Sequence, residues 1–435
     1  MNWLETYRDR VLTAEQAVLQ IKSNTRLFLS GNCSVPQTVL AALTERAPAL
    51  TNVEIVQVLT IGSADYVAPE MAGHLRVNTT FISDNVRLAV NEGRADFTPV
   101  FLSEIPSLFR NGLLPLDFAL IQVSPPDEHG FCSFGVEVGV TKPAAQAARH
   151  VIAELNPEMP RTLGDSFIHI SKLDTIVCVD YPLPEMSMAS TDPVAERIAD
   201  HVASLIPDGA TLQTGIGAIP DAVLKRLGNH KDLGVHTELF ADGVIDLVDR
   251  GIINGERKTL HPGKIVAGFL LGTRKLYEFV HDNPIVELHP TDYVNDPFNI
   301  AQNSQMVAIN SAIEVDLTGQ VCSDSIGPRF YSGVGGQVDF IYGASRSKGG
   351  IPIIALPSTL AKRDGHNISR IAAMINHGGG VVTTRNHVHY VVTEHGVADL
   401  YGKSIKQRAK ALIEIAAPEF REELERKARE LKYLW

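Results

Sequence analysis

Residues 205–227, "LIPDGATLQTGIGAIPDAVLKRL", repeat the pattern of residues 21–43, "IKSNTRLFLSGNCSVPQTVLAAL", without a gap. Gly31 and Pro36 of the first copy fall opposite a glycine and a proline of the second. Each copy reads as a short apolar strand, a glycine turn, and a helix with a proline near its start. The repeat therefore predicts two similar α/β units in one chain.

The rest of the chain continues this alternation of strand and helix patterns. Short runs rich in valine and isoleucine, each closed by glycine, proline or serine, include "VEIVQVLTIG" (53–62), "FALIQVSPP" (118–126) and "IPIIALPS" (351–358). Helical patterns lie between such runs, which is typical of α/β folds with mostly parallel sheets. We predict two similar open α/β domains, an N-terminal one at 1–186 and a C-terminal one at 187–435, separated by a linker rich in proline and serine.

The composition excludes several classes of protein. The 435 residues carry a net charge of −11, with no basic stripe of the kind that binds nucleic acid or an anionic membrane. The four cysteines form no CxxC pair, so neither a zinc ribbon nor a disulfide framework is indicated. No apolar run reaches the roughly 18 residues that span a bilayer, and the N-terminus lacks a signal-peptide pattern. We expect a cytoplasmic protein without nucleic-acid or membrane partners.

One glutamate stands out at the predicted end of a buried strand. The stretch "GVHTELFADG" (234–243) places Glu238 there, before an Asp-Gly turn. We expect its counterpart in the first copy to be Gln57 or Val58, depending on a small gap, and neither is a carboxylate. A residue needed only for the fold would be expected in both copies. The difference therefore favours catalysis over the structural alternative, a hydrogen-bonded polar group at a strand end.

Two glycine-rich loops are candidate binding sites. "QTGIGAIPDAVL" (213–224) has a Gly-x-Gly turn before a helix whose first residue we expect to be Pro220. "YSGVGGQVDFIYGA" (331–344) has three glycines within positions 333–336. Bare backbone at a helix start offers N–H groups to an anion or to a developing oxyanion. The structural alternatives are an ordinary strand–helix turn for the first loop and a flexible surface loop for the second.

Two further stretches contain residue types that often act in catalysis or metal binding. In "VSPPDEHGFCSFG" (123–135) we expect the Asp-Glu-His triplet (127–129) to form a solvated turn. In "NHVHYVVTEHG" (386–396) we expect His387 and His389 to share one face of a strand. No other ligand cluster has a recognisable spacing, so we predict packed or hydrogen-bonded histidines and no metal site.

The combination of one glutamate with glycine loops suits one class of reaction. No Ser/His/Asp signature and no GxSxG motif stand out in the sequence. A carboxylate with an ordinary pKa near 4.3 is already ionised at neutral pH, and it becomes a better nucleophile when a closed site replaces its hydration. Its attack on a thioester carbonyl creates an oxyanion that backbone N–H groups can hold. The product is an acid anhydride, to which a thiol can return.

Several long motifs, in the right order, resemble the acetyl-CoA hydrolase/transferase family. The motifs are "LQTGIGAIPDAVL", "GVHTELFADGVIDL", "EVDLTGQVCSDSIGP", "SGVGGQVDF" and "YVVTEHGVADLYGKSIKQRAKALIEIAAPEF". The likeness runs essentially end to end and includes the N-terminal "SPPDEHGF" loop. It implies two CoA-transferase-type domains with the active site between them, usually in a homodimer. It also implies coenzyme A or acyl-CoA as a substrate and no permanently bound cofactor.

The resemblance assigns roles to individual positions. Glu238 would be the nucleophile, which becomes first an acyl-glutamyl anhydride and then a glutamyl-CoA thioester. Asn295 would donate to the oxyanion from its side chain, and the backbone of Gly336 would contact the oxyanion and the pantetheine arm. The expected CoA-binding positions are Gly215, Ile216, Gly217, Ala218, Ile219, Gly335, Gly336, Ser358 and Lys362.

The expected activity is CoA transfer between an acyl-CoA such as acetyl-CoA and a short-chain acid such as 4-hydroxybutyrate or butyrate. The alternative in the same chemistry is an acyl-CoA hydrolase, in which water attacks the glutamyl intermediate. A non-catalytic CoA or metabolite sensor is a rival from another class, but a sensor needs no nucleophile. A sugar-phosphate isomerase would need an acid/base pair at a phosphate loop.

Overall fold

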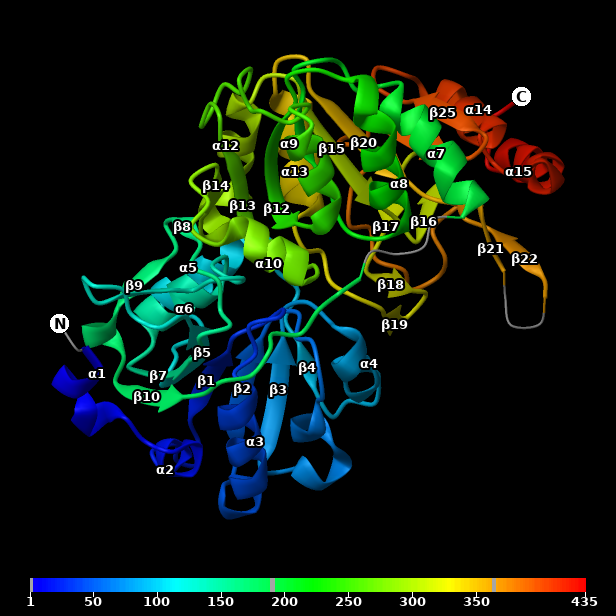
Figure 1. The fold of residues 1–435 in the computed structure, drawn as a ribbon. Helices are drawn as coiled ribbons and strands as arrows, with labels where there is room; N and C mark the ends of the chain where they lie inside the picture. The colour runs from blue at the N-terminus through cyan, green and yellow to red at the C-terminus, as the bar shows by residue number, and fades with distance from the viewer. Residues whose placement is uncertain (1–2, 188–191, 362–364) are drawn as a thin grey trace. The chain divides into compact units, whose positions relative to one another are not determined.

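The computed structural model describes residues 3–187, 192–361 and 365–435 (Figure 1). Its contacts divide the chain into two compact units of similar size. Unit 1 comprises Met1–Ser187, Glu238–Phe240 and Val266–Val294, and unit 2 comprises Met188–Thr237, Ala241–Ile265 and Asn295–Trp435.

Unit 1 is built on a sheet of seven strands whose neighbours all run parallel. In spatial order these are β10 (Thr175–Cys178), β7 (His150–Leu155), β5 (Phe118–Val123), β1 (Arg26–Leu29), β2 (Val53–Gln57), β3 (Leu75–Thr79) and β4 (Asp96–Phe97). The α-helices of unit 1 are α1 (Trp3–Thr6), α2 (Ala14–Val18), α3 (Gln37–Arg46), α4 (Asp84–Asn91), α5 (Ile105–Arg110), α6 (Thr141–Ala147), α10 (Arg274–Val280) and α11 (Thr291–Val294). Aliphatic side chains of the central strands and of α3, such as Leu27, Ile55 and Val39, form its main core.

The sheet strands of unit 2 repeat this design. Their spatial order is β25 (Gly396–Asp399), β24 (Tyr390–Thr393), β20 (Ile351–Ala355), β15 (Met306–Ser311), β11 (Thr211–Gln213) and β12 (Gly234–Phe240), whose last three residues belong to unit 1. All neighbours are parallel except β24 and β25. The α-helices are α7 (Pro193–Ala203), α8 (Ala218–Arg226), α9 (Ile245–Asp249), α12 (Pro297–Gln302), α13 (Gln337–Arg346), α14 (Ile405–Glu414) and α15 (Pro418–Glu430). The prediction of an α/β fold with mostly parallel sheets is confirmed.

Short strands complete both units. Unit 1 also holds β13 (Ile265–Leu270) apart from its first residue, the parallel pair of β14 (Val286–Leu288) with β8 (Leu163–Gly164), and the antiparallel pair of β6 (Phe131–Ser133) with β9 (Phe167–His169). Unit 2 has a small sheet of β17 (Val321–Cys322), β16 (Glu314–Asp316) and β23 (Ile371–Ala372), and two hairpins, β18 (Ser325–Ile326) with β19 (Arg329–Phe330) and β21 (Thr359–Ala361) with β22 (Asn367–Ser369). No helix in the described ranges has the length and apolar character needed to cross a membrane.

The internal repeat corresponds to the same position in both sheets. In unit 1, β1 lies between β2 and β5 and leads into α3. In unit 2, β11 lies between β12 and β15 and leads into α8. All four pairings are parallel, so the weak sequence repeat reflects the same strand–turn–helix unit at the centre of each sheet.

The strand register corrects the expected counterpart of the candidate glutamate. Leu27 pairs with Ile55 in unit 1, and its counterpart Thr211 pairs with Gly234 in unit 2. Four positions further on lie Leu59 in the first copy and the glutamate in the second. The expected counterparts, Gln57 and Val58, lie two and one positions before Leu59 and were wrong. The two copies share few identical residues, so the sequence could not fix the register, which the pairing of the strands sets. The first copy therefore still has an uncharged residue where the second copy has the glutamate.

Candidate active site

The first glycine turn lines a cavity of about 230 Å³ in unit 2. Gly217 has a φ of 115°, which only glycine adopts readily, and it is the N-cap of α8. Ile216 keeps 41% of its surface exposed, and Ala218 and Ile219 also line the cavity. The expected first helical residue was wrong. Pro220 is the third residue of α8, a place it can take because the N–H groups of the first turn have no helical acceptor.

Glu238 lies inside β12, two residues before the strand ends at Phe240. It is half-buried between the buried side chains of Thr237 and Leu239. Thr237 Oγ1 donates a 3.0 Å hydrogen bond to the carbonyl oxygen of Thr214, the residue before the glycine turn. The residue next to the carboxylate is thus fixed to the backbone that enters the turn.

The second glycine loop is tied to the same cavity. Gly335 has a φ of 56°, and Gly336 is the N-cap of α13, with its carbonyl accepting from the Phe340 N–H at 3.0 Å. The buried amide of Gln337 donates to the carbonyl oxygen of Ser311 at 2.6 Å. Ser311 lines the cavity beside the first turn. Both predicted glycine loops therefore belong to one local arrangement within unit 2.

Asn295 is fully buried, just before Asp296, the N-cap of α12. Helix α12 packs closely on α13, since a Cβ added at Gly343 would lie 2.5 Å from a side-chain atom of Ile300. Asn295 does not line the cavity of the glycine turn, but it precedes a helix that is packed against the one starting at Gly336.

Ser358 and Lys362 were also predicted as CoA contacts. Ser358 is fully buried, and both its hydroxyl and its N–H donate to the Glu394 carboxylate, at 2.5 and 2.8 Å. Its neighbour Pro357 lines the cavity, so Ser358 lies behind the wall and not at its surface. Lys362 lies outside the described residues.

The Asp-Glu-His triplet forms the solvated turn that the sequence predicted. The Asp127 carboxylate accepts from the N–H groups of His129 and Phe131, both at 2.9 Å, and forms an ion pair with Arg161 at 2.7 Å. Glu128 and His129 are exposed. The triplet therefore acts as a turn.

The histidines near the C-terminus are packed and hydrogen-bonded, but not on a strand. A turn closed by the His387 N–H and the Thr384 carbonyl precedes β24, which begins only at Tyr390. His387 Nδ1 lies 3.1 Å from Thr384 Oγ1, and the His389 ring stacks on Tyr401 with centroids 4.2 Å apart. The prediction that both rings share a strand face was wrong because the turn takes up this segment.

Arg370 is a candidate binding residue that the sequence did not reveal. It lines the cavity of the glycine turn. Its guanidinium donates to the carbonyl oxygens of Ile313, at 2.8 Å, and Ala312. Burial lowers its pKa from the usual value, since the charged form loses hydration. A single arginine in "NISRI" carries no motif, so only the fold brings it to the cavity.

The helix start that corresponds to α8 in unit 1 is closed by a carboxylate. The N–H of Val39, in the first turn of α3, donates to fully buried Glu154 at 2.7 Å. The Tyr181 hydroxyl donates to the second carboxylate oxygen and accepts from Gln122 at 2.8 Å. In unit 2 the corresponding helix start lines a cavity.

This closed carboxylate predicts a pH dependence of stability. Burial raises the pKa of Glu154 to about 7, against the opposing effect of its hydrogen bonds. Between pH 4.5 and 7 the folded protein would hold a proton that the unfolded chain has released, so the free energy of unfolding falls as pH rises. Urea unfolding should measure this effect in wild type and in Glu154→Gln. The free energy of unfolding of wild type minus that of the variant should fall by about 3 kcal/mol from the lower to the upper end of this pH range. Equal pH slopes would contradict the prediction.

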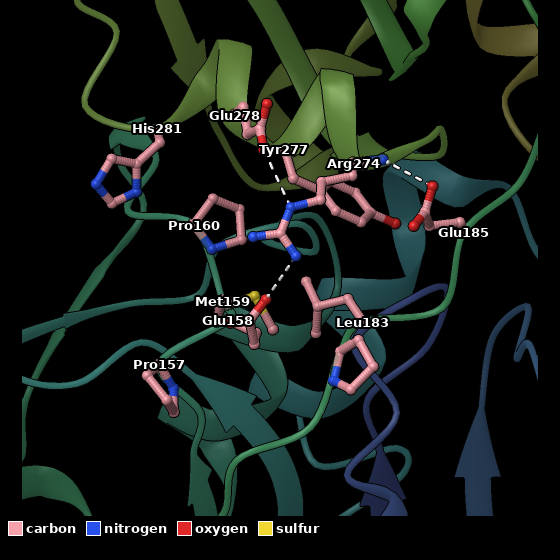
Figure 2. Close-up of a pocket in the computed structure, with 11 residues that line it drawn as sticks. Pro157, Glu158, Met159, Pro160, Leu183, Glu185, Arg274, Tyr277, Glu278 and His281 are labelled. Carbon is pink, nitrogen blue, oxygen red and sulfur yellow. Dashed lines mark hydrogen bonds and ion pairs between the residues drawn. The ribbon is translucent and has the colours of Figure 1, made fainter.

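A second cavity, of about 170 Å³, lies in unit 1 (Figure 2). Arg274 lines this cavity, and its guanidinium forms ion pairs with Glu278 at 3.0 Å and with Glu158 at 3.2 Å. Glu185 accepts from the Arg274 N–H at 2.9 Å. Three carboxylates around one paired cation do not suit a polyanionic ligand such as CoA.

Comparison with known proteins gives consistent matches over the chain. The acetyl-CoA hydrolase/transferase N-terminal domain matches residues 1–185, and the C-terminal domain of the same family matches residues 272–428. The 4-hydroxybutyrate coenzyme A transferase of Clostridium kluyveri is 53% identical over 98% of both chains. The succinyl-CoA:acetate/propanoyl-CoA:succinate CoA transferase of Fasciola hepatica is 50% identical over 94% of this chain and 85% of its own. The crystal structure of 4-hydroxybutyrate CoA-transferase from Porphyromonas gingivalis has a TM-score of 0.85 at 44% identity, covering 99% of this chain and all of its own.

Proposed function

This chain belongs to the acetyl-CoA hydrolase/transferase family and is an acyl-CoA:carboxylate CoA-transferase, and we propose that it carries CoA through a covalent thioester on Glu238. We further propose acetyl-CoA as the acyl donor, and 4-hydroxybutyrate or a related short-chain acid such as butyrate as the acceptor. The 4-hydroxybutyrate relatives support this choice of acid.

The proposed reaction runs through two kinds of covalent intermediate, an anhydride and a thioester. A Glu238 carboxylate oxygen attacks the thioester carbonyl, the C–S bond breaks, and CoA leaves as a thiolate from an acyl-glutamyl anhydride. The thiolate then attacks the glutamyl carbonyl, releasing the donor's acid and leaving CoA on Glu238 as a thioester. The acceptor carboxylate repeats the two steps in reverse and leaves as the new acyl-CoA. Each tetrahedral intermediate carries an oxyanion that the backbone N–H groups of the glycine loops and the Asn295 amide would stabilise.

One observation supports this proposal above the others. A half-buried carboxylate follows Thr237, whose hydroxyl is bonded to the entry of a glycine turn that lines a cavity. In the first copy, by contrast, the Glu154 carboxylate accepts from the Val39 N–H in the first turn of the corresponding helix. Covalent transfer requires a nucleophile within reach of the bound thioester.

Steady-state kinetics test transfer against its alternatives. We expect acetyl-CoA with a panel of short-chain acids to yield new CoA esters, with parallel double-reciprocal lines because the first acid leaves before the second reacts. 4-Hydroxybutyrate and butyrate should give the highest kcat/KM. Release of free CoA at a rate independent of the acid would identify a hydrolase, and intersecting lines would contradict the covalent route.

Assembly and location stay predictions. We propose a homodimer that works in the cytoplasm on CoA esters and acids, without a permanently bound cofactor. Light scattering at micromolar concentration would measure the mass directly, and a mass of one chain would contradict the dimer.

A further inference from the structure

The charged groups that line the cavity of the glycine turn are Asp192 and Arg370. The Asp192 carboxylate caps α7, accepting from the N–H groups of Val194 and Ala195 at 2.9 and 2.8 Å. Its charge is therefore directed at a helix start, where it is stabilised by the helix dipole. Among the described residues that line the cavity, no carboxylate is hydrogen-bonded to Arg370.

The Arg370 guanidinium is held in place by neutral groups. Its Nε and Nη2 donate to the carbonyl oxygens of Ile313 and Ala312, which fixes the plane of the group. Across the described residues, no carboxylate forms an ion pair with it. The nearby Glu394 carboxylate instead binds the N–H and hydroxyl of Ser358. The Glu394 charge still acts on the guanidinium through space and partly offsets the lowering of the Arg370 pKa by burial. A half-buried arginine that is oriented by carbonyls, with no carboxylate hydrogen-bonded to it among the described residues, has N–H donors to offer to an anion.

The start of α8 also lines this cavity and adds to the electrostatic field. The N-cap of α8 is Gly217, which has no side chain to bond to the first N–H groups of the helix. A helix start carries partial positive charge, and the guanidinium lies in the lining of the same cavity. The exposed side chain of Ile216 leaves apolar surface beside these donors.

We propose that Arg370 binds anionic oxygens of a substrate in this cavity and sets the affinity for that substrate. This rests on the proposed CoA transfer and adds a binding residue to it. Two groups share the required chemistry, the phosphate oxygens of CoA and the carboxylate of the acid, and kinetics distinguish them. Arg370 positions the substrate and takes no part in the covalent steps.

The test compares Arg370→Gln with Arg408→Gln in steady-state transfer. Arg408 is a matched control, because it is also half-buried, donates to backbone carbonyls of Thr318 and Arg385, and does not line the cavity. If CoA phosphates are the ligand, Arg370→Gln raises the KM for acetyl-CoA on the order of 10- to 100-fold, the effect of one charge-assisted hydrogen bond, while kcat is kept. With acetyl-pantetheine, which lacks phosphates, variant and wild type should then be equal. If the acid is the ligand, its KM rises instead, with either donor.

Unchanged KM values for both substrates in folded Arg370→Gln would overturn the inference. If that variant fails to fold, Arg370→Lys is measured in its place. Lysine keeps the charge but lacks the planar guanidinium with its paired donors, so we expect a smaller rise in the same KM. Unchanged KM values in Arg370→Lys would then overturn the inference. Failure of the proposed function is distinguishable, because wild type would then form no CoA thioester, whereas Arg370→Gln should still form it at saturating acetyl-CoA.

Discussion

Replacing Glu238 with alanine should abolish CoA transfer while leaving the fold intact. The carboxylate is the proposed nucleophile, and losing a nucleophile should lower kcat at least about 10⁴-fold. Its side chain is only half-buried on β12, so its removal should open little cavity in the core. Transfer assays together with circular dichroism and thermal unfolding measure both expectations.

A glutamate on the "SPPDEHGF" turn provides the matched control. Glu128 is exposed, and Glu128→Ala should keep wild-type transfer rates. Near-normal transfer by a well-folded Glu238→Ala protein would exclude the nucleophile. A large loss in Glu128→Ala would move the chemistry toward the N-terminal turn.

Replacing Gly336 with valine should lower kcat about 100-fold. The φ of −99° at this position is open to other residues, so the added side chain acts by its bulk and not through backbone strain. It would stand at the start of α13, where the proposed backbone contact with the thioester lies, and losing one oxyanion donor costs about 3 kcal/mol.

Gly228→Val separates this effect from a general cost of adding valine. Gly228 also has a negative φ, and its added Cβ would meet the flexible end of Arg250 at 2.9 Å. That variant should keep its kcat. Unchanged kcat and KM in Gly336→Val would show that the second glycine loop is a surface turn.

The sequence predicted the α/β class because local patterns carry that information. Alternating apolar runs and helical stretches specify strands and helices, and the repeat at 21–43 and 205–227 predicted the strand–turn–helix unit found in both sheets. The glycine turn was also recognisable, since a positive φ at Gly217 selects for glycine.

Features that depend on contacts between residues far apart in the sequence could not be predicted from local sequence patterns. The counterpart of Glu238 was misplaced because register is set by hydrogen bonding between strands. The bonds of Ser358 to Glu394 gave no local signal either, since they come from a residue 36 positions away. Arg370 gave no signal for the same reason, since its cavity is assembled from segments far apart in sequence.

Mass spectrometry of the enzyme after incubation with acetyl-CoA alone tests the covalent route most directly. The account predicts CoA bonded as a thioester to the peptide that contains "GVHTELFADG", and loss of the adduct in Glu238→Ala. Sodium borohydride should reduce the thioester and inactivate wild type, because reduction removes the carboxylate. A transferase that uses Glu238 must show this adduct. Its absence from active wild-type enzyme, or its presence on any other residue, would contradict the account.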